Sequence, residues 1–239
     1  RDRTGKLKSI AGNVQHADQA ERESYIHIHM ERIADSDIAD GIVAEVQSVL
    51  EEVRAAVVDW QPMRQAVLGQ IEALRGSRSP LPTAVVTESI DFLSWLLNNR
   101  FTFLGMSEYR ISGQGKQRMV EPLDQSALGI LRLQQRKVFR NASRREAARY
   151  QTDRAVLVEK SDLVSRVHRP VVMDYVGVYE FDDDGHITRE LRIVGLFTST
   201  AYTEPASSIP ILRRKIDTVM LRSGFSPQGH SGKGLLNVL

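Results

Sequence analysis

The stretch VHRPVVMDYVGVYEF, residues 167–181, contains a histidine, an arginine and an aspartate within seven positions. These residue types could serve as a general base, an anion-binding cation and an orienting carboxylate, so the stretch is a candidate for acid–base catalysis. The spacing argues against this reading. His168 and Asp174 share a face of an extended strand but lie six residues apart, about 20 Å along it. A straight strand cannot bring them into direct contact, and we predict no catalytic residue here.

Two further groups of side chains could bind a metal. His27 and His29 lie on one face of a predicted strand, but only Glu31 is close enough in sequence to add a third ligand. The alternation of residue types already explains a solvated strand face. The acidic loop FDDDGH, residues 181–186, lacks the spacing and the distal glutamate of a calcium loop, and a hairpin turn explains it better. We therefore predict no metal site.

The motifs give little support for binding nucleic acid or a nucleotide. Arg132, Arg136 and Arg140 form a row at helical spacing that could contact phosphates, but no aromatic residues or recognition motif accompany it. The glycine turns GQGK and HSGKG lack the spacing of a phosphate-binding loop, and no Gly-x-Gly-x-x-Gly is present. We predict no nucleic-acid partner and no cofactor-binding residue in this chain.

The composition indicates the compartment. The 239 residues include no cysteine, which excludes disulfides and thiolate chemistry and favours a reducing environment. Lysine and arginine number 32 against 30 aspartates and glutamates, so there is no global attraction to nucleic acid or acidic membranes. No apolar run approaches the roughly 18 residues of a membrane span. We expect a cytoplasmic protein with no membrane partner. Because the chain starts at Arg1 and stops within an amphipathic segment, we also expect a piece of a larger protein.

The first third of the chain reads as a strand followed by helices. Alternating residues predict a half-buried strand from Ser24 to Ile33, and Asp35 or Ser36 suits the N-cap of the helix that follows. A helix continues or restarts near Pro62, which marks a kink or a new first turn. GSRSPLP, residues 76–82, is the clearest linker.

Beyond the linker the pattern predicts an α+β fold, an antiparallel sheet with flanking helices. Thr83 or Thr87 could cap a helix that ends near the Asn98-Asn99 pair. Four strands are expected, within RFTFLGMSEYRI, RAVLVEK, VVMDYVGVYEF and HITRELRIVGLFTSTAY. A fifth would have to come from QRMVEPL, and SALGILRL is predicted to be a short helix. In the third of these strands, the face with Met173, Tyr175 and Tyr179 is expected to be the apolar one. DDDGH should form a hairpin with Gly185 at positive φ, and a helix should run from Pro210 to Gly224.

The order and spacing of several short strings resemble one protein family. FLSWL, FTFLG, VHRP, DYVGV, GLFTS and RRK follow one another as in the N-terminal region of the large, bacterial-type NAD-specific glutamate dehydrogenases. ESYIHIHMER and VLEEVRAAVVDWQPM resemble the segment that precedes them there. The resemblance covers nearly all of the chain, although none of these strings is diagnostic alone.

The resemblance implies a chain several times longer, with ACT-type and PAS-type modules in its N-terminal part. On that reading residues 1–58 are part of an ACT-like strand-strand-helix module, and residues 59–82 are a helical connector and linker. Residues 83–206 are a PAS-like module, and residues 207–239 form a trailing helix that leads to the next domain. The family's catalytic lysine and aspartate and its dinucleotide motif have no counterpart here. NAD is therefore implied for the parent enzyme and no cofactor for this fragment.

Three functions are consistent with this reading. The first is a non-catalytic regulatory and assembly segment of an NAD-dependent glutamate dehydrogenase, which oxidatively deaminates L-glutamate to 2-oxoglutarate. The second is a sensor for an amino acid or another small effector, with His168, Arg169 and Tyr175 as candidate residues of a ligand pocket or interface. The third is a structural scaffold for oligomerisation. The expected partners are downstream domains of the same chain and, in the full-length enzyme, further copies of it.

Overall fold

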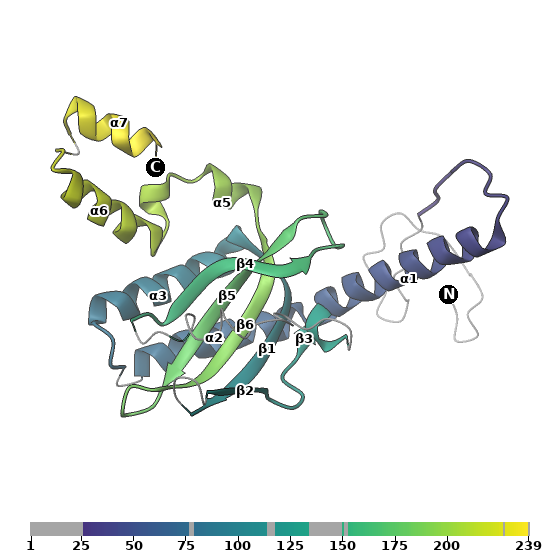
Figure 1. The fold of residues 1–239 in the computed structure, drawn as a ribbon, viewed down its shortest axis with the longest axis horizontal. Coiled ribbons are helices and arrows are strands. Elements are labelled where there is room, and N and C mark those ends of the chain that lie inside the picture. Colours follow the sequence, from purple (N-terminus) through teal and green to yellow (C-terminus); the bar gives the residue numbers. More distant parts are fainter. Residues whose placement is uncertain are drawn as a thin grey trace, which may run out of the picture. The chain divides into compact units, whose positions relative to one another are not determined.

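The computed structural model describes residues 26–76, 79–113, 118–133, 150, 153–226 and 228–238 (Figure 1). The chain divides into two compact units, one up to Val43 and one from Ala44 onward. Predictions for residues 1–25 and for Arg136 and Arg140 lie outside the described residues.

Helix α1 (Ser36–Val58) follows an irregular stretch, residues 26–35. The N-cap prediction is confirmed for Asp35, because its Oδ1 accepts hydrogen bonds from the backbone N–H groups of Asp37 (2.9 Å) and Ile38 (3.4 Å). The strand predicted from Ser24 to Ile33 is wrong for residues 26–33. Alternation produces a strand only where a neighbour supplies hydrogen bonds and a surface to pack on, and none of the described strands pairs with this stretch.

Helices α2 (Trp60–Gly76) and α3 (Thr83–Trp95) follow, with a distorted turn, η1 (Leu96–Arg100), at the end of α3. Pro62 is the third residue of α2, where its missing N–H costs no helical hydrogen bond, so the predicted new first turn is confirmed. The predicted threonine cap of α3 is wrong, because Pro82 occupies the N-cap position and no side chain caps the helix. The break at the asparagine pair is confirmed, with Asn99 at φ 59°.

The sheet has the strand order β2-β1-β6-β5-β4, each neighbour antiparallel, and a short strand, β3, also pairs with β1. The α+β class and all five predicted strands are confirmed. The segment predicted as a short helix instead forms β3 and a 3₁₀ turn, η3 (Ile130–Arg132). The β5–β6 hairpin is confirmed, with Gly185 at φ 82°. The strands are β1 (Phe101–Ser112), β2 (Met119–Pro122), β3 (Leu128–Gly129), β4 (Val156–Val164), β5 (Val172–Phe181) and β6 (Ile187–Phe197).

Strand β5 is buried on both of its faces. Val176 and Val178 pack with side chains of α2 and α3, which lie behind the sheet in Figure 1. Met173 and Tyr175 pack on the opposite face with Ile130, Leu131 and residues of β6. The prediction of a single apolar face is therefore wrong, because the chain on either side of the sheet covers both faces of this strand.

After β6 the chain forms α5 (Ser199–Thr203), η4 (Ala206–Ser208), α6 (Leu212–Ser223) and α7 (His230–Val238). Helix α6 starts two residues later than the predicted Pro210. It ends at Gly224 as predicted, with that glycine in the left-handed conformation. Residues 198–211, which connect β6 to α6, are called the connecting segment below. No described helix is both long and apolar enough to cross a membrane.

Candidate functional site

The structure places the three predicted site residues in different surroundings. Tyr175 is fully buried in β5, and His168 is exposed at φ 71° in the turn before that strand. Arg169 is partly buried, and its Nη2 donates to the backbone oxygen of Phe197 at 2.6 Å. Arg169 thus bonds to the end of β6, whereas the Tyr175 hydroxyl donates to Glu190 within the core. Their role in a pocket or interface stays a prediction.

A buried polar network occupies the face of the sheet opposite α2 and α3. Glu190 and Arg192 on β6 are 0% and 3% exposed. The Glu190 carboxylate accepts hydrogen bonds from the hydroxyls of Tyr175 and Tyr150 (2.8 Å for Tyr150) and from Arg192 Nε at 2.7 Å. Arg192 Nη2 also donates to the Tyr150 hydroxyl at 2.8 Å, and its guanidinium lies 3.8 Å from the centre of the Tyr109 ring.

This network was not predicted from the sequence, although the spacing of two of its charged residues indicates it. Glu190 and Arg192 stand two positions apart in β6, so they must share a face, and the apolar residues Val194 and Leu196 continue that face. Two opposite charges at that spacing, on a strand too apolar to be solvated, indicate a buried ion pair. The tyrosine partners lie on other segments and could not be read from this pattern.

The electrostatics of the network stabilise one protonation state. Burial raises the pKa of Tyr175 and of Tyr150, and the nearby Glu190 charge raises both further, while Arg192 opposes the change. Burial alone lowers the pKa of Arg192, but Glu190 and the two tyrosines together outweigh this effect, and the pKa is raised. Both tyrosines are therefore neutral donors at neutral pH. The hydrogen bonds among these groups hold the core together.

A second polar cluster docks the C-terminal half of α1 on the turn after β4. Arg166 donates to Glu45 Oε1 at 2.7 Å, to Ser48 Oγ at 2.8 Å, and to the buried carboxylate of Glu52. The hydrogen bonds that Arg166 donates to Glu52 and Glu45 raise its pKa, and the one to Glu52 has the larger effect. The ion pairs position a helix, since all three partners lie on α1.

The connecting segment is held at its middle and at its C-terminal end. Glu204 accepts hydrogen bonds from Trp95 Nε1 and from Arg100 Nε, each at 2.6 Å. Glu88 on α3 accepts from the backbone N–H of Ile211 and from Arg213 Nε, each at 2.8 Å. Helix α3 and the turn at its end therefore fix the path from β6 into α6.

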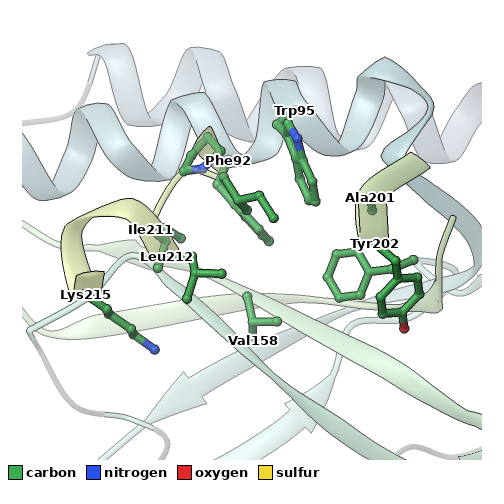
Figure 2. Close-up of a pocket in the computed structure, with 11 residues that line it drawn as sticks. Phe92, Trp95, Val158, Ala201, Tyr202, Ile211, Leu212 and Lys215 are labelled. Atoms are coloured by element: carbon green, nitrogen blue, oxygen red, sulfur yellow. The ribbon is translucent and has the colours of Figure 1, made fainter. Parts of the chain in front are cut away.

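Between these two anchors lies an apolar pocket of about 370 Å³, drawn in Figure 2. Trp95 and Phe92 reach into it from α3, and Val158 of β4 lies on the opposite side. The three predicted site residues are not among those that line it, but the Arg169 guanidinium lies 5.8 Å from the centre of the Tyr202 ring. The lining residues are Phe92, Trp95, Val158, Phe197, Ala201, Tyr202, Ile209, Pro210, Ile211, Leu212 and Lys215.

The pocket could not be predicted from local pattern. Its walls come from segments about a hundred residues apart, as the 109-residue separation of Trp95 and Glu204 illustrates. Within the sequence, the apolar lining residues look like ordinary core positions of the helices, strands and connecting segment from which they come. The pocket forms only because the connecting segment is anchored to α3 and to the turn at its end, which leaves a space between these parts of the chain.

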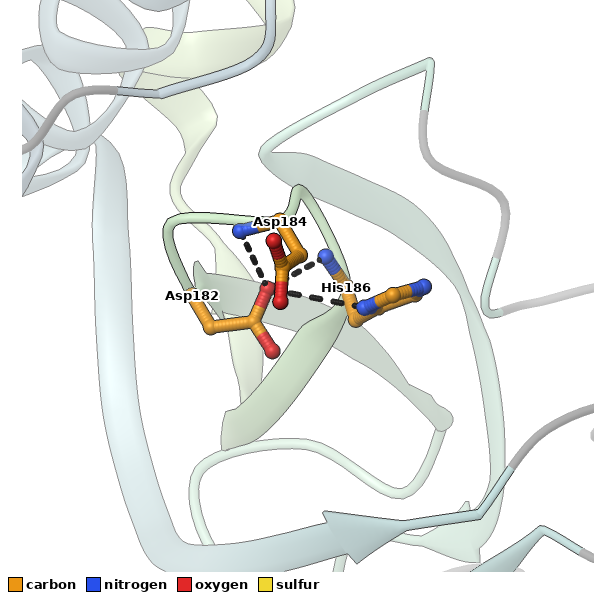
Figure 3. A group of neighbouring side chains, drawn as sticks. All are labelled: Asp182, Asp184 and His186. Carbon is orange, nitrogen blue, oxygen red and sulfur yellow. Dashed lines mark hydrogen bonds and ion pairs between the residues drawn. The ribbon is translucent and has the colours of Figure 1, made fainter.

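The acidic hairpin loop brings Asp182, Asp184 and His186 together, with ligand-type atoms within 4.8 Å of one another (Figure 3). Asp182 Oδ1 accepts hydrogen bonds from the backbone N–H groups of Asp184 (3.1 Å) and His186 (2.8 Å). The Asp182 side chain thus closes the turn, which is the role predicted for this loop.

The fold and its clusters define an α+β module in which ion pairs fix helices to the rest of the fold and an apolar pocket lies beside α3. Comparison with known proteins then gives the relationship. The chain is 38% identical over 245 residues to the NAD-specific glutamate dehydrogenase of Halomonas elongata and 33% identical over 242 residues to that of Pseudomonas aeruginosa. All of the chain is covered in both cases, and it spans 15% of the length of each relative. Residues 209–239 match the family model for glutamate dehydrogenase, helical motif 1. The resemblance to the NAD-specific glutamate dehydrogenases is confirmed.

Proposed function

We propose that the chain is a non-catalytic regulatory and assembly segment of an NAD-dependent glutamate dehydrogenase. The parent enzyme would convert L-glutamate to 2-oxoglutarate and ammonium and would bind NAD outside this segment. The observation that carries the proposal is the similarity along the whole chain to two relatives of which it spans 15%. The ion pairs described above support it, because they attach α1 and α6 to the sheet domain.

The division into modules is part of the proposal. The six-stranded antiparallel sheet supports a PAS-like module at residues 83–206, and the family match from residue 209 supports a separate trailing segment at 207–239. The ACT-like module at 1–58 rests on the resemblance, since α1 is its only described regular element. The connector at 59–82 would contain α2. Downstream domains, homo-oligomerisation and a cytoplasmic location of the parent enzyme are further predictions.

Two alternatives each have an observation in their favour. A sensor for a small effector is supported by the lined pocket between α3 and the connecting segment. A structural scaffold is supported by large apolar side chains that are exposed, such as Val57 at 69% and Leu221 at 83%.

Two assays test the proposal. The isolated 239-residue chain should give no NAD reduction with glutamate above the protein-free rate, and steady turnover would overturn the proposal. In the longer enzyme, Arg213→Gln should loosen α6 from α3 and change subunit assembly or effector response, while Arg222→Gln on the exposed side of the same helix should not. Identical assembly and kinetics for both variants would contradict a role for this segment.

A further inference from the structure

We propose that the apolar pocket of Figure 2 binds an organic monocarboxylate with an apolar, flat or branched body and no ammonium group. The carboxylate would pair with Lys215. This deepens the sensor alternative and rests on the proposed regulatory role for its biological meaning, although the binding itself is a property of this chain. At about 370 Å³ the pocket falls within the range of small-molecule sites, roughly 300 to 1,000 Å³.

The walls select an apolar body. Phe92 and Trp95 stack with ring centroids 5.7 Å apart, and Trp95 meets Phe197 at 6.0 Å. The indole N–H of Trp95 donates to Glu204, so this ring has only its apolar surface left to offer a ligand. Aromatic faces of this kind pack well against an aryl or branched alkyl group.

The charges select an anion. Lys215 is the single charged residue among the eleven that line the pocket, and it has no ion-pair partner within the described residues. Figure 2 shows its side chain leaving α6 at the edge of the pocket, on the same side as Val158. Lys215 also borders a neighbouring hollow that contains Glu88 and Asp153. The nearby carboxylates are engaged elsewhere, Glu88 with Arg213, Asp153 with Arg154 and Glu204 with Arg100. A carboxylate would therefore find a charged partner, whereas the ammonium of an amino acid would meet no carboxylate that is not already paired.

The pocket is held open before a ligand arrives. Thr198 Oγ1 donates to the Asn99 backbone oxygen at 2.9 Å at the start of the connecting segment, and the anchors at Glu204 and Glu88 fix its middle and its C-terminal end. Binding would therefore not have to order a loop. Ile211 lines the pocket at φ 68°, a conformation that a β-branched side chain rarely adopts, and its N–H is held by Glu88. Because Ile211 directly precedes α6, a bound ligand would contact the start of the matched helical motif.

The test uses Trp95 as the reporter. The chain has two tryptophans, so Trp60→Phe, at a position 47% exposed, leaves Trp95 as the single fluorophore. Titration with 3-phenylpropionate should give a saturable change in fluorescence, while 3-phenylpropylamine and L-phenylalanine should give none at the same concentrations. Calorimetry on the unmodified chain provides a second, label-free measurement.

Substitutions of Lys215 distinguish direct pairing with the ligand carboxylate from a general effect of positive charge on α6. Lys215→Gln should weaken 3-phenylpropionate binding about tenfold, and Lys215→Arg should retain most of it. The matched control is Arg214→Gln, since Arg214 is the adjacent cation of α6 and lines a neighbouring hollow but not this pocket. It should change the affinity less than twofold, and circular dichroism should show all three variants folded.

Three results would overturn the proposal: no saturable signal with 3-phenylpropionate, equal binding of the amine, or equal losses in Lys215→Gln and Arg214→Gln. Failure here leaves the dehydrogenase-segment proposal standing, because that proposal is tested by NAD reduction and assembly. Turnover by the isolated chain would overturn that proposal and leave the pocket unaffected.

Discussion

Glu190→Gln is the sharpest test of the buried network. The substitution keeps the shape of the side chain and removes its charge, which leaves the Arg192 guanidinium, 3% exposed, without a counter-charge. Breaking a buried ion pair in this way typically costs about 3 to 5 kcal/mol. The Tyr109 ring beneath the guanidinium and the remaining amide oxygen retain part of the interaction. We therefore expect the free energy of unfolding to fall by about 3 kcal/mol, the lower end of that range.

The free energy of unfolding would be measured by urea denaturation followed by circular dichroism, with equal m-values required for comparison. Glu72→Gln is the matched control, because the Glu72 side chain is 70% exposed and pairs with Arg75 three residues away. It should change the stability by less than about 0.5 kcal/mol. The double variant Glu190→Gln/Arg192→Met removes both charges and leaves an acceptor for the tyrosine hydroxyls. It should be at least about 1 kcal/mol more stable than Glu190→Gln alone.

Two outcomes would refute this reasoning. One is a Glu190→Gln variant within about 1 kcal/mol of the unmodified chain, which would mean that the guanidinium reaches water or another partner in solution. The other is a double variant less stable than the single one, which would mean that Arg192 contributes mainly through packing.

Three further predictions follow from the packing and the pKa shifts. Gly195→Ala should destabilise the fold by about 3 kcal/mol or more in urea denaturation, because a Cβ there would overlap a backbone carbonyl of β1. Gly69→Ala is the control: a Cβ at that helical position would meet open space, so this substitution should stabilise the fold by about 0.5 to 1 kcal/mol. Arg166→Gln should speed hydrogen exchange in residues 44–58 without affecting β5 and β6, and unchanged exchange would contradict docking by this arginine. The pKa of Tyr150 and of Tyr175 is raised in the folded state, so their contribution to the free energy of unfolding is complete below the unfolded pKa of about 10. Above that pH the contribution falls by about 1.4 kcal/mol per pH unit for each tyrosine. Tyr150→Phe should therefore reduce the slope of the unfolding free energy against pH between about pH 10 and 12.

The elements could be predicted from sequence where local pattern and tertiary contacts agree. The β5–β6 hairpin follows from alternation on both sides of a turn that contains Gly185, and the helix from Asp35 follows from its cap. The strand predicted at 24–33 is wrong over the described residues 26–33, because alternation says nothing about whether a pairing strand is present. The prediction of one apolar face on β5 failed for a similar reason, because the sequence of a strand does not say which other segments cover its two faces.

The site was less predictable than the fold. Tyr175 was singled out by its place in an apolar strand, but its partner Glu190 lies on another strand. The pocket depends on Trp95 and Lys215, which are far apart in the chain and unremarkable within their own helices. Spacing rules work within an element, whereas these two sites are made by the crossing of elements.

The position of the network on β6 also has a consequence for folding. Side chains of a strand change faces at every residue, so a one-residue slip of β6 against β5 would carry Glu190 and Arg192 into the layer where Val178 and Leu191 pack under the helices. Two charges would then lie among aliphatic side chains, away from the tyrosine hydroxyls. The pair thus penalises misaligned hairpins more strongly than it rewards the aligned one, and it acts as a register check while the sheet assembles.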